Sequence, residues 1–221
     1  MKHIISSLIL ISALAFILRV WGVDFGLPYT FHADETHTIN LSASLGYNFL
    51  NPKIFWKPAL VYYLIALGYG IYFVIGRCIG LFPSLDNFIR LFILNPTPFY
   101  LIARIIIGVI FGTISIPVIY MIGMRLCSER TGLIAALFLA VSFIHVQNSH
   151  YAAHDIPVLF FIVITVLFSL DIFLKGRPVD YVKSGIALGL AVATKYNAAL
   201  AFVSILAAHM LFLKKDKPDN L

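Results

Sequence analysis

The stretch "IISSLILISALAFILRVWGV", residues 4–23, decides the fold class, because it holds 20 consecutive residues with a single charge. As an α-helix it would be about 30 Å long, which is the thickness of the hydrocarbon core of a bilayer. Lys2 and the small-residue triplet "ALA" at 13–15 resemble a secretory signal, but the apolar run continues well past that triplet. We therefore predict an uncleaved first membrane-spanning helix.

The composition extends this conclusion to the whole chain. Of 221 residues, 61% are hydrophobic and 12% are charged, whereas a soluble domain carries about 25% charged residues. No strand-like alternation persists along the chain, so we predict an all-α polytopic membrane protein. The net charge of +6 comes from basic residues dispersed at the ends of apolar segments. This dispersal indicates orientation signals rather than a nucleic-acid partner.

The distribution of basic residues constrains the topology. Five further apolar runs follow, at 58–82, 99–124, 132–148, 156–174 and 184–213. If every run crossed once from a cytoplasmic N-terminus, the basic loops 125–131 and 175–183 would lie outside, against the positive-inside rule. We therefore expect run 58–82 to lie in the outer interface or to re-enter. Cys78 and Cys127 then lie on opposite sides and cannot pair.

The last run predicts a hairpin. Residues 184–213 would form a helix of about 45 Å, which is long for a bilayer, and the run contains "TKYN" at 194–197. Since a charged Lys is costly at mid-bilayer, we expect a turn that brings Lys195 to the outer face. The chain then returns Lys214, Lys215 and Lys217 to the cytoplasm.

This topology gathers four polar stretches at the outer face. They are "HADETH" (32–37), "FWKPAL" (55–60), "HYAAHD" (150–155) and "TKYN", with Arg104 near the start of a span. Cations at this level suit a phosphate whose tail stays in lipid. A neighbouring carboxylate suits the removal of a proton from a nucleophile. The pattern therefore indicates a catalytic carboxylate at a membrane surface.

Simpler structural roles exist for the same residues. Asp34 could be the N-cap of an interfacial helix that runs from Glu35 to about Tyr47, and Asp155 could cap the helix that starts at Ile156. On the interfacial helix, Asp34 and His37 would share a face and Glu35 would point about 100° away, so the two acids should have different roles. Lys57 could be a snorkelling interfacial residue, and Lys195 a helix-end charge.

The histidines raise the question of a metal. His150 and His154 have the i,i+4 spacing of metal ligands on a helix, but the sequence does not establish a helix across them. We therefore predict no metal site and leave a divalent cofactor open.

The order of these stretches resembles the GT-C class of lipid-phosphate-dependent glycosyltransferases, and among them family 39. That family includes protein O-mannosyltransferases and the aminoarabinose transferases of lipid A. The resemblance rests on five motifs in order: "HADET", "WKPAL", "YLIARIIIGVIFG", "SHYAAHDIP" and "GIALGLAVATKYN". It covers essentially the whole chain and implies a GT-C-like helix bundle with an interfacial helix in the first outer loop.

The resemblance also implies a reaction. A sugar would pass from a polyprenyl-phosphate donor to an acceptor at the extracytoplasmic face of the plasma membrane, with inversion. The implied catalytic residues are Asp34 as base, Glu35 as an orienting group and Asp155 as a second acid. The implied ligands of the donor phosphate are Lys57, Arg104 and Lys195, and the candidate substrate contacts are His37, His150, His154 and Tyr196. Trp56 stands where aminoarabinose transferases have an acid, so their metal site is not carried over.

Members of this family are usually much longer. Residues 1–221 are therefore expected to be an N-terminal catalytic module that is weak or inactive without a C-terminal half or partner subunit. Two other classes stay open, namely a non-catalytic membrane subunit or lipid-binding remnant, and a small transporter. Transporters place their binding groups near the bilayer midplane, whereas the acids here lie at the ends of spans.

Overall fold

A computed structural model describes residues 2–215, and every regular element in this range is a helix. The all-α fold is therefore confirmed. The elements are α1 (Lys2–Val20), α2 (Ala33–Ser44), α3 (Leu60–Cys78), α4 (Leu85–Leu94), α5 (Thr97–Arg104), the π-helix η1 (Ile105–Ile110), α6 (Phe111–Leu126), α7 (Glu129–Val141), α8 (Phe143–Asn148), α9 (Asp155–Lys175), α10 (Pro178–Thr194), the 3-10 helix η2 (Tyr196–Ala201) and α11 (Phe202–Lys215).

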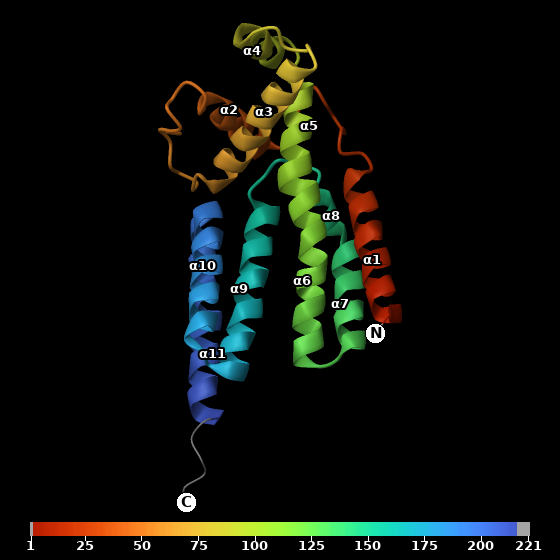
Figure 1. The fold of residues 1–221 in the computed structure, drawn as a ribbon, viewed down its shortest axis with the longest axis vertical. Coiled ribbons are helices and arrows are strands. Elements are labelled where there is room, and N and C mark those ends of the chain that lie inside the picture. The colour runs from red at the N-terminus through yellow and green to blue at the C-terminus, as the bar shows by residue number, and fades with distance from the viewer. Residues whose placement is uncertain (1, 216–221) are drawn as a thin grey trace, which may run out of the picture.

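The helices form an elongated bundle with a cap at one end. Figure 1 shows α1, α6, α7, α9 and α10 running along the long axis, while α2, α3 and α4 lie at the upper end. Five stretches of the described chain are long and apolar enough to cross a membrane. They are His3–Val20, Leu60–Cys78, Thr97–Leu126, Asp155–Lys175 and Tyr196–Lys215. The chain is thus a polytopic membrane protein.

Helix α3 has the length of a span but a different position from the other candidates. Figure 1 places it beside α5, above the upper ends of α9 and α10. Its side chains pack with α4 and α5 in an aromatic cluster, in which Phe88 and Phe99 have ring centroids 5.0 Å apart and Tyr69 and Phe99 5.2 Å apart. This position fits the expectation that run 58–82 does not cross with the bundle, which stays a prediction.

The hairpin predicted in the last run is confirmed. Helix α10 ends at Thr194, Lys195 is extended (φ −153°, ψ 126°), and η2 and α11 lead the chain back along the bundle. Figure 1 shows the turn at the upper end and the C-terminus at the opposite end. Lys214 and Lys215 lie in the last turn of α11, and Lys217 lies outside the described residues.

The run 132–148 is not one helix, contrary to the pattern. It breaks at Ser142, whose backbone is extended, between α7 and α8. Arg19 of α1 is fully buried there and donates to the Nδ1 atom of His145 at 2.7 Å. It also donates to the carbonyl oxygens of Ala15, Leu139 and Ala140. The bonds to Leu139 and Ala140 satisfy carbonyls at the end of α7, as an apolar surrounding requires.

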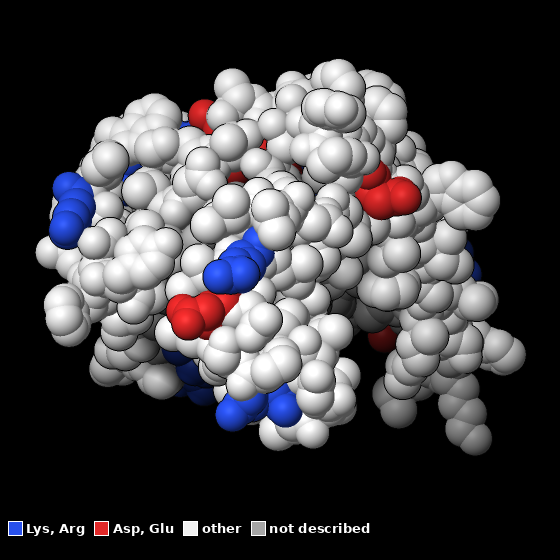
Figure 2. Space-filling model, turned by 90° about the horizontal axis from the view of Figure 1, so that it is seen from above, with Lys and Arg blue, Asp and Glu red and all other residues white. Residues whose placement is uncertain are grey.

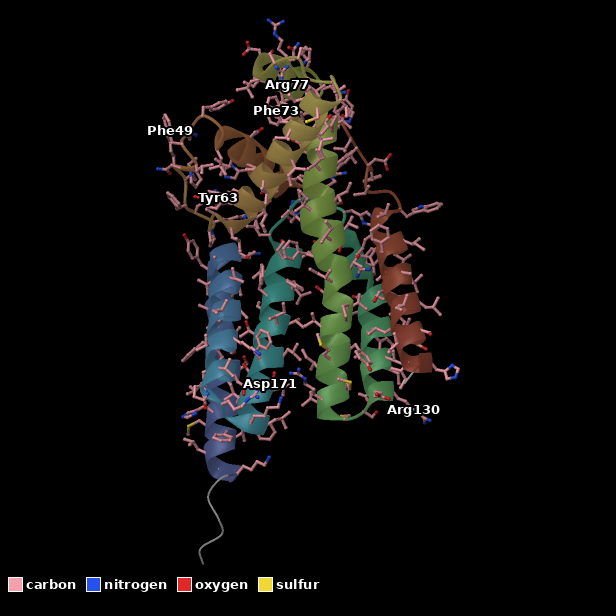
Figure 3. All side chains as sticks on the ribbon, in the orientation of Figure 1. Phe49, Tyr63, Phe73, Arg77, Arg130 and Asp171 are labelled. Carbon is pink, nitrogen blue, oxygen red and sulfur yellow. The ribbon has the colours of Figure 1, made fainter. Side chains whose placement is uncertain are left out.

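The two ends of the bundle carry different charged groups. In Figure 3, Arg77 lies at the end near α4, while Arg130 and Asp171 lie toward the opposite end. Asp171 pairs there with Arg125 at 2.7 Å and with Lys175 at 3.3 Å. These two cations come from the basic loops that the charge pattern assigns to the cytoplasm.

Candidate functional site

The motif "HADETH" (32–37) lies at the start of α2, and neither of its two acids occupies the N-cap position. The N-cap of α2 is His32, and Asp34 and Glu35 follow in the first turn. Asp34 is therefore not the N-cap. The Asp34 side chain is 37% exposed and that of Glu35 is fully buried. The two acids thus have different environments, while the expectation that they have different roles stays a prediction.

Asp34 forms an ion pair with the second polar stretch. Its Oδ2 atom lies 2.7 Å from Nζ of Lys57, which also lies 4.8 Å from the ring centre of Trp56. The Lys57 ammonium lowers the pKa of Asp34 below its ordinary value of 3.8. Trp56 in turn donates its indole N–H to Nε2 of His37 at 2.7 Å. Thus "HADETH" and "FWKPAL" meet.

Glu35 forms a different and fully buried pair. Its two carboxylate oxygens accept from Nε and Nη2 of Arg104 at 2.7 and 2.8 Å, and Oε1 also accepts from the amide of Ala152 at 3.0 Å. Nη1 of Arg104 donates to the carbonyls of Val23 and Phe25. The predicted contact between Arg104 and a phosphate does not fit this geometry, because its guanidinium is buried and engaged. The pair instead ties α2 and α5 to the loop that precedes α9.

The third and fourth polar stretches form a second ion pair. Asp155 is the first residue of α9, and its Oδ1 atom accepts from Nζ of Lys195 at 2.8 Å. The N-cap of α9 is His154, which makes no side-chain capping bond, so Asp155 is not a cap either. Tyr196 donates its hydroxyl to the carbonyl of Phe55 at 2.9 Å. This bond joins the hairpin turn to the stretch that holds Lys57.

A buried histidine adjoins Asp155 in the sequence and is subject to the charges of both ion pairs. The His154 side chain is 1% exposed and meets the ring of Tyr62 edge-on, with ring centroids 5.3 Å apart. Burial is the main cause that lowers the pKa of His154 to about 4; Lys57 and Lys195 act in the same direction and the two carboxylates in the opposite one, so the ring is neutral at ordinary pH. The charges that act on this ring belong to Lys57, Asp155, Asp34 and Lys195. The two ion pairs are therefore treated as one site. Figure 2 views the molecule from the end at which this site lies.

Two residues, Tyr62 and His150, have surroundings that the sequence pattern does not predict. Tyr62, in the first turn of α3, is fully buried and packs edge-on against His154. His150 contacts a different part of the protein from His154, because its Nε2 atom bonds the carbonyl of Trp21. It lines a cavity of about 410 Å³ with Trp21, Phe25 and Tyr151. No cluster of three or more metal-ligand side chains occurs among residues 2–215.

An apolar cavity adjoins the second ion pair. It measures about 350 Å³ and lies between α7, α8 and α9, with walls that include Leu139, Val158 and Ile162. Asp155 and His145 contribute polar groups to its lining. The charged site therefore borders on apolar space that extends into the bundle.

Comparisons with known proteins agree with this architecture. Residues 90–218, more than half of the chain, match the family described as dolichyl-phosphate-mannose-protein mannosyltransferase. The match includes Asp155 and Lys195, while Asp34 and Lys57 precede it. An uncharacterised protein of Aquifex aeolicus (strain VF5) is 27% identical over 161 residues, which cover 73% of this chain and 28% of that protein. The chain thus spans little more than a quarter of that relative. No solved structure matches the chain significantly.

Proposed function

The chain belongs to the dolichyl-phosphate-mannose-protein mannosyltransferase family, of the GT-C class, and on this premise we propose that it is a membrane glycosyltransferase. It moves a sugar from a polyprenyl-phosphate donor to an acceptor at the extracytoplasmic face of the plasma membrane. The observation that carries the proposal is the convergence of two carboxylate–lysine pairs, Asp34–Lys57 and Asp155–Lys195, at one end of the bundle. Such a site offers both a proton acceptor and cations for a lipid phosphate.

Asp34 is the proposed base. Its carboxylate accepts the proton of the acceptor nucleophile, whose freed electron pair forms the new bond to the anomeric carbon of the sugar. The bond from that carbon to the phosphate oxygen breaks, and its electron pair leaves with the polyprenyl phosphate. Attack from the face opposite the leaving group inverts the anomeric centre, and no covalent sugar–enzyme intermediate is needed.

Lys57 and Lys195 are the proposed ligands of the donor phosphate. Each now pairs with a carboxylate at 2.7–2.8 Å, and an arriving phosphate competes for both ammonium groups. Their charges then stabilise the negative charge that grows on the leaving group. Loss of its lysine partner leaves Asp34 free to receive a proton, so donor binding prepares the base.

The other site residues position these groups. Glu35 is held by Arg104 and anchors the loop that carries His154 and Asp155. His37 supports Trp56 beside Lys57, and Tyr196 ties the turn at Lys195 to the same stretch. Positioning of this kind supplies much of an enzyme's rate acceleration.

The test measures the polyprenyl monophosphate and free mannose that are released from polyprenyl-phosphate-mannose, the type of donor named in the family description, with water as the acceptor. The liposomes hold the chain together with the C-terminal half or partner subunit that it is expected to need. Asp34→Asn keeps the side-chain shape and removes the base, so we expect release to fall by at least about 100-fold. The matched control is Asp24→Asn, since Asp24 is an exposed carboxylate in the same outer stretch. Full release by Asp34→Asn would refute the assignment, and an equal loss in Asp24→Asn would show that the effect is not specific to Asp34.

A further inference from the structure

His154 is a buried polar side chain without a hydrogen-bond partner in the described part of the chain. Neither of its ring nitrogens has a hydrogen-bond partner among residues 2–215, and the hydroxyl of neighbouring Tyr62 has none there either. Both side chains are almost fully buried. A neutral imidazole carries one N–H donor and one acceptor, and buried polar groups are rarely left unpaired. These two residues therefore need an explanation that packing alone does not supply.

Their surroundings suggest which groups they could bind. The charges of both ion pairs act on the ring of His154, and the ring of Tyr62, which meets it edge-on at 5.3 Å, is subject to the charge of Asp34. In the ligand-free arrangement each carboxylate already has a lysine, which leaves the histidine without an acceptor. A phosphate that draws the lysines away leaves the carboxylates without donors. The unpaired donors and the newly unpaired acceptors then occupy the same small region.

We propose that His154 is a positioning residue for the base, and that one of its ring N–H groups takes over the hydrogen bond to Asp34 when Lys57 moves to the donor phosphate. The inference rests on the proposed function, because a phosphate causes the exchange there. Since His154 is neutral at ordinary pH, it does not compete with the lysines for the phosphate. A carboxylate held by one neutral donor keeps its orientation and remains a better proton acceptor than one paired with an ammonium group.

The first test needs no ligand. In the ¹⁵N-histidine-labelled protein in lipid nanodiscs, Lys57→Met removes the competing lysine. We expect the His154 N–H resonance, assigned through its loss in His154→Asn, to shift to the position of a donor to a carboxylate. The Asp34→Ala, Lys57→Met double variant should lose that shift. Lys53→Met removes an exposed lysine from the same stretch and should leave the resonance unchanged.

Two results of this experiment overturn the proposal. The first is a His154 resonance that is the same in Lys57→Met as in the unmodified protein. The second is a shift that persists when Asp34 is also removed, because the partner is then a different group.

The second test adds polyprenyl monophosphate to the labelled protein, with polyprenol as the control that lacks the phosphate. The phosphate should produce the His154 shift seen in Lys57→Met, and the polyprenol should not. Binding is followed independently through the ³¹P resonance of the lipid. Bound phosphate with an unchanged His154 overturns the inference. Absence of binding counts against the proposed function, while the ligand-free test still decides the hydrogen-bond exchange.

Transfer kinetics separate positioning from folding. We expect His154→Leu to lower kcat about tenfold with little change in the donor KM. His154→Asn retains an N–H donor and should recover most of the rate. Equal rates in both variants would contradict a hydrogen-bonding role. His3→Leu, on the exposed first turn of α1, is the control.

Discussion

Asp34 and Glu35 are neighbours in the sequence but have separate environments in the fold. Consecutive residues of a helix point about 100° apart, so only one of the two can face the stretch that holds Lys57. Glu35 points inward to Arg104, whereas the side chain of Asp34 is 37% exposed. The residue that can reach a substrate is therefore Asp34, and its electrostatic partner controls when it acts.

Lys57→Met should shift the acidic limb of the pH–rate profile to higher pH. Lys57 holds the pKa of Asp34 below 3.8, so the base stays ionised above that lowered pKa and is lost only when the pH falls through it. Without the ammonium group the pKa rises, and the rate begins to fall at a higher pH. The profile of kcat/KM reports this group in the free enzyme, and an unmoved acidic limb would contradict the pairing. Lys53→Met is the matched control.

Arg104 is predicted to matter for stability more than for donor affinity. Arg104→Met leaves Glu35 as an unpaired buried charge, so we expect the free energy of unfolding to fall by about 3–5 kcal/mol. The double variant with Glu35→Gln should recover most of that loss. Unfolding in mixed micelles measures both effects, with Arg90→Met, at an exposed position, as control. If Arg104→Lys is as stable as the unmodified protein but has a strongly raised donor KM, the result would instead favour a direct contact between Arg104 and the donor phosphate.

Among the elements, the π-helix η1 and the loop between α8 and α9 are in close contact at Gly108. A Cβ atom there would overlap the carbonyl of Ser149, which begins the loop that carries His154. Gly108→Ala should therefore displace the loop, cost about 1–3 kcal/mol and lower kcat. Gly189 of α10 has open space around it, so Gly189→Ala should stabilise by about 0.5–1 kcal/mol. Thermal unfolding and donor turnover of the two variants test the difference, and equal behaviour would argue against a close contact at Gly108.

The elements also show where sequence patterns succeed and fail. The turn at Lys195 could be predicted, because a 30-residue apolar run and a charge in its interior conflict with bilayer dimensions. The break at Ser142 could not, since it follows from Arg19, which is distant in the sequence and binds the freed carbonyls. Helix α4 lies between two of the apolar runs and is too short to stand out as a span. Ser84 caps it by accepting from the amide of Asn87, and its Phe88 packs against Phe73 of α3 and Phe99 of α5.

At the scale of the whole molecule, the position of the site could be predicted more fully than its internal pairing. The bias of basic residues and the cost of a charge in lipid bring four polar stretches to one end of the bundle. Which lysine meets which carboxylate depends on the rotation of each helix about its axis. This rotation is fixed by packing and leaves no short-range pattern. His154 and Tyr62 become recognisable as a pair only once the start of α3 is placed against the residue that precedes α9.

The orientation of the bundle yields a prediction that the two native cysteines can test. Cys78 ends α3 at the same end as α4, and Cys127 follows α6 at the opposite end (Figure 1), and both are free and exposed. A membrane-impermeant maleimide applied to intact cells should label Cys78 and spare Cys127, because the basic loop at Cys127 is expected inside. Cys78→Ser and Cys127→Ser assign the signals, and permeabilised cells should label both sites. Labelling of Cys127 alone would place the ion pairs on the cytoplasmic side, where a donor displayed at the outer surface could not reach Asp34.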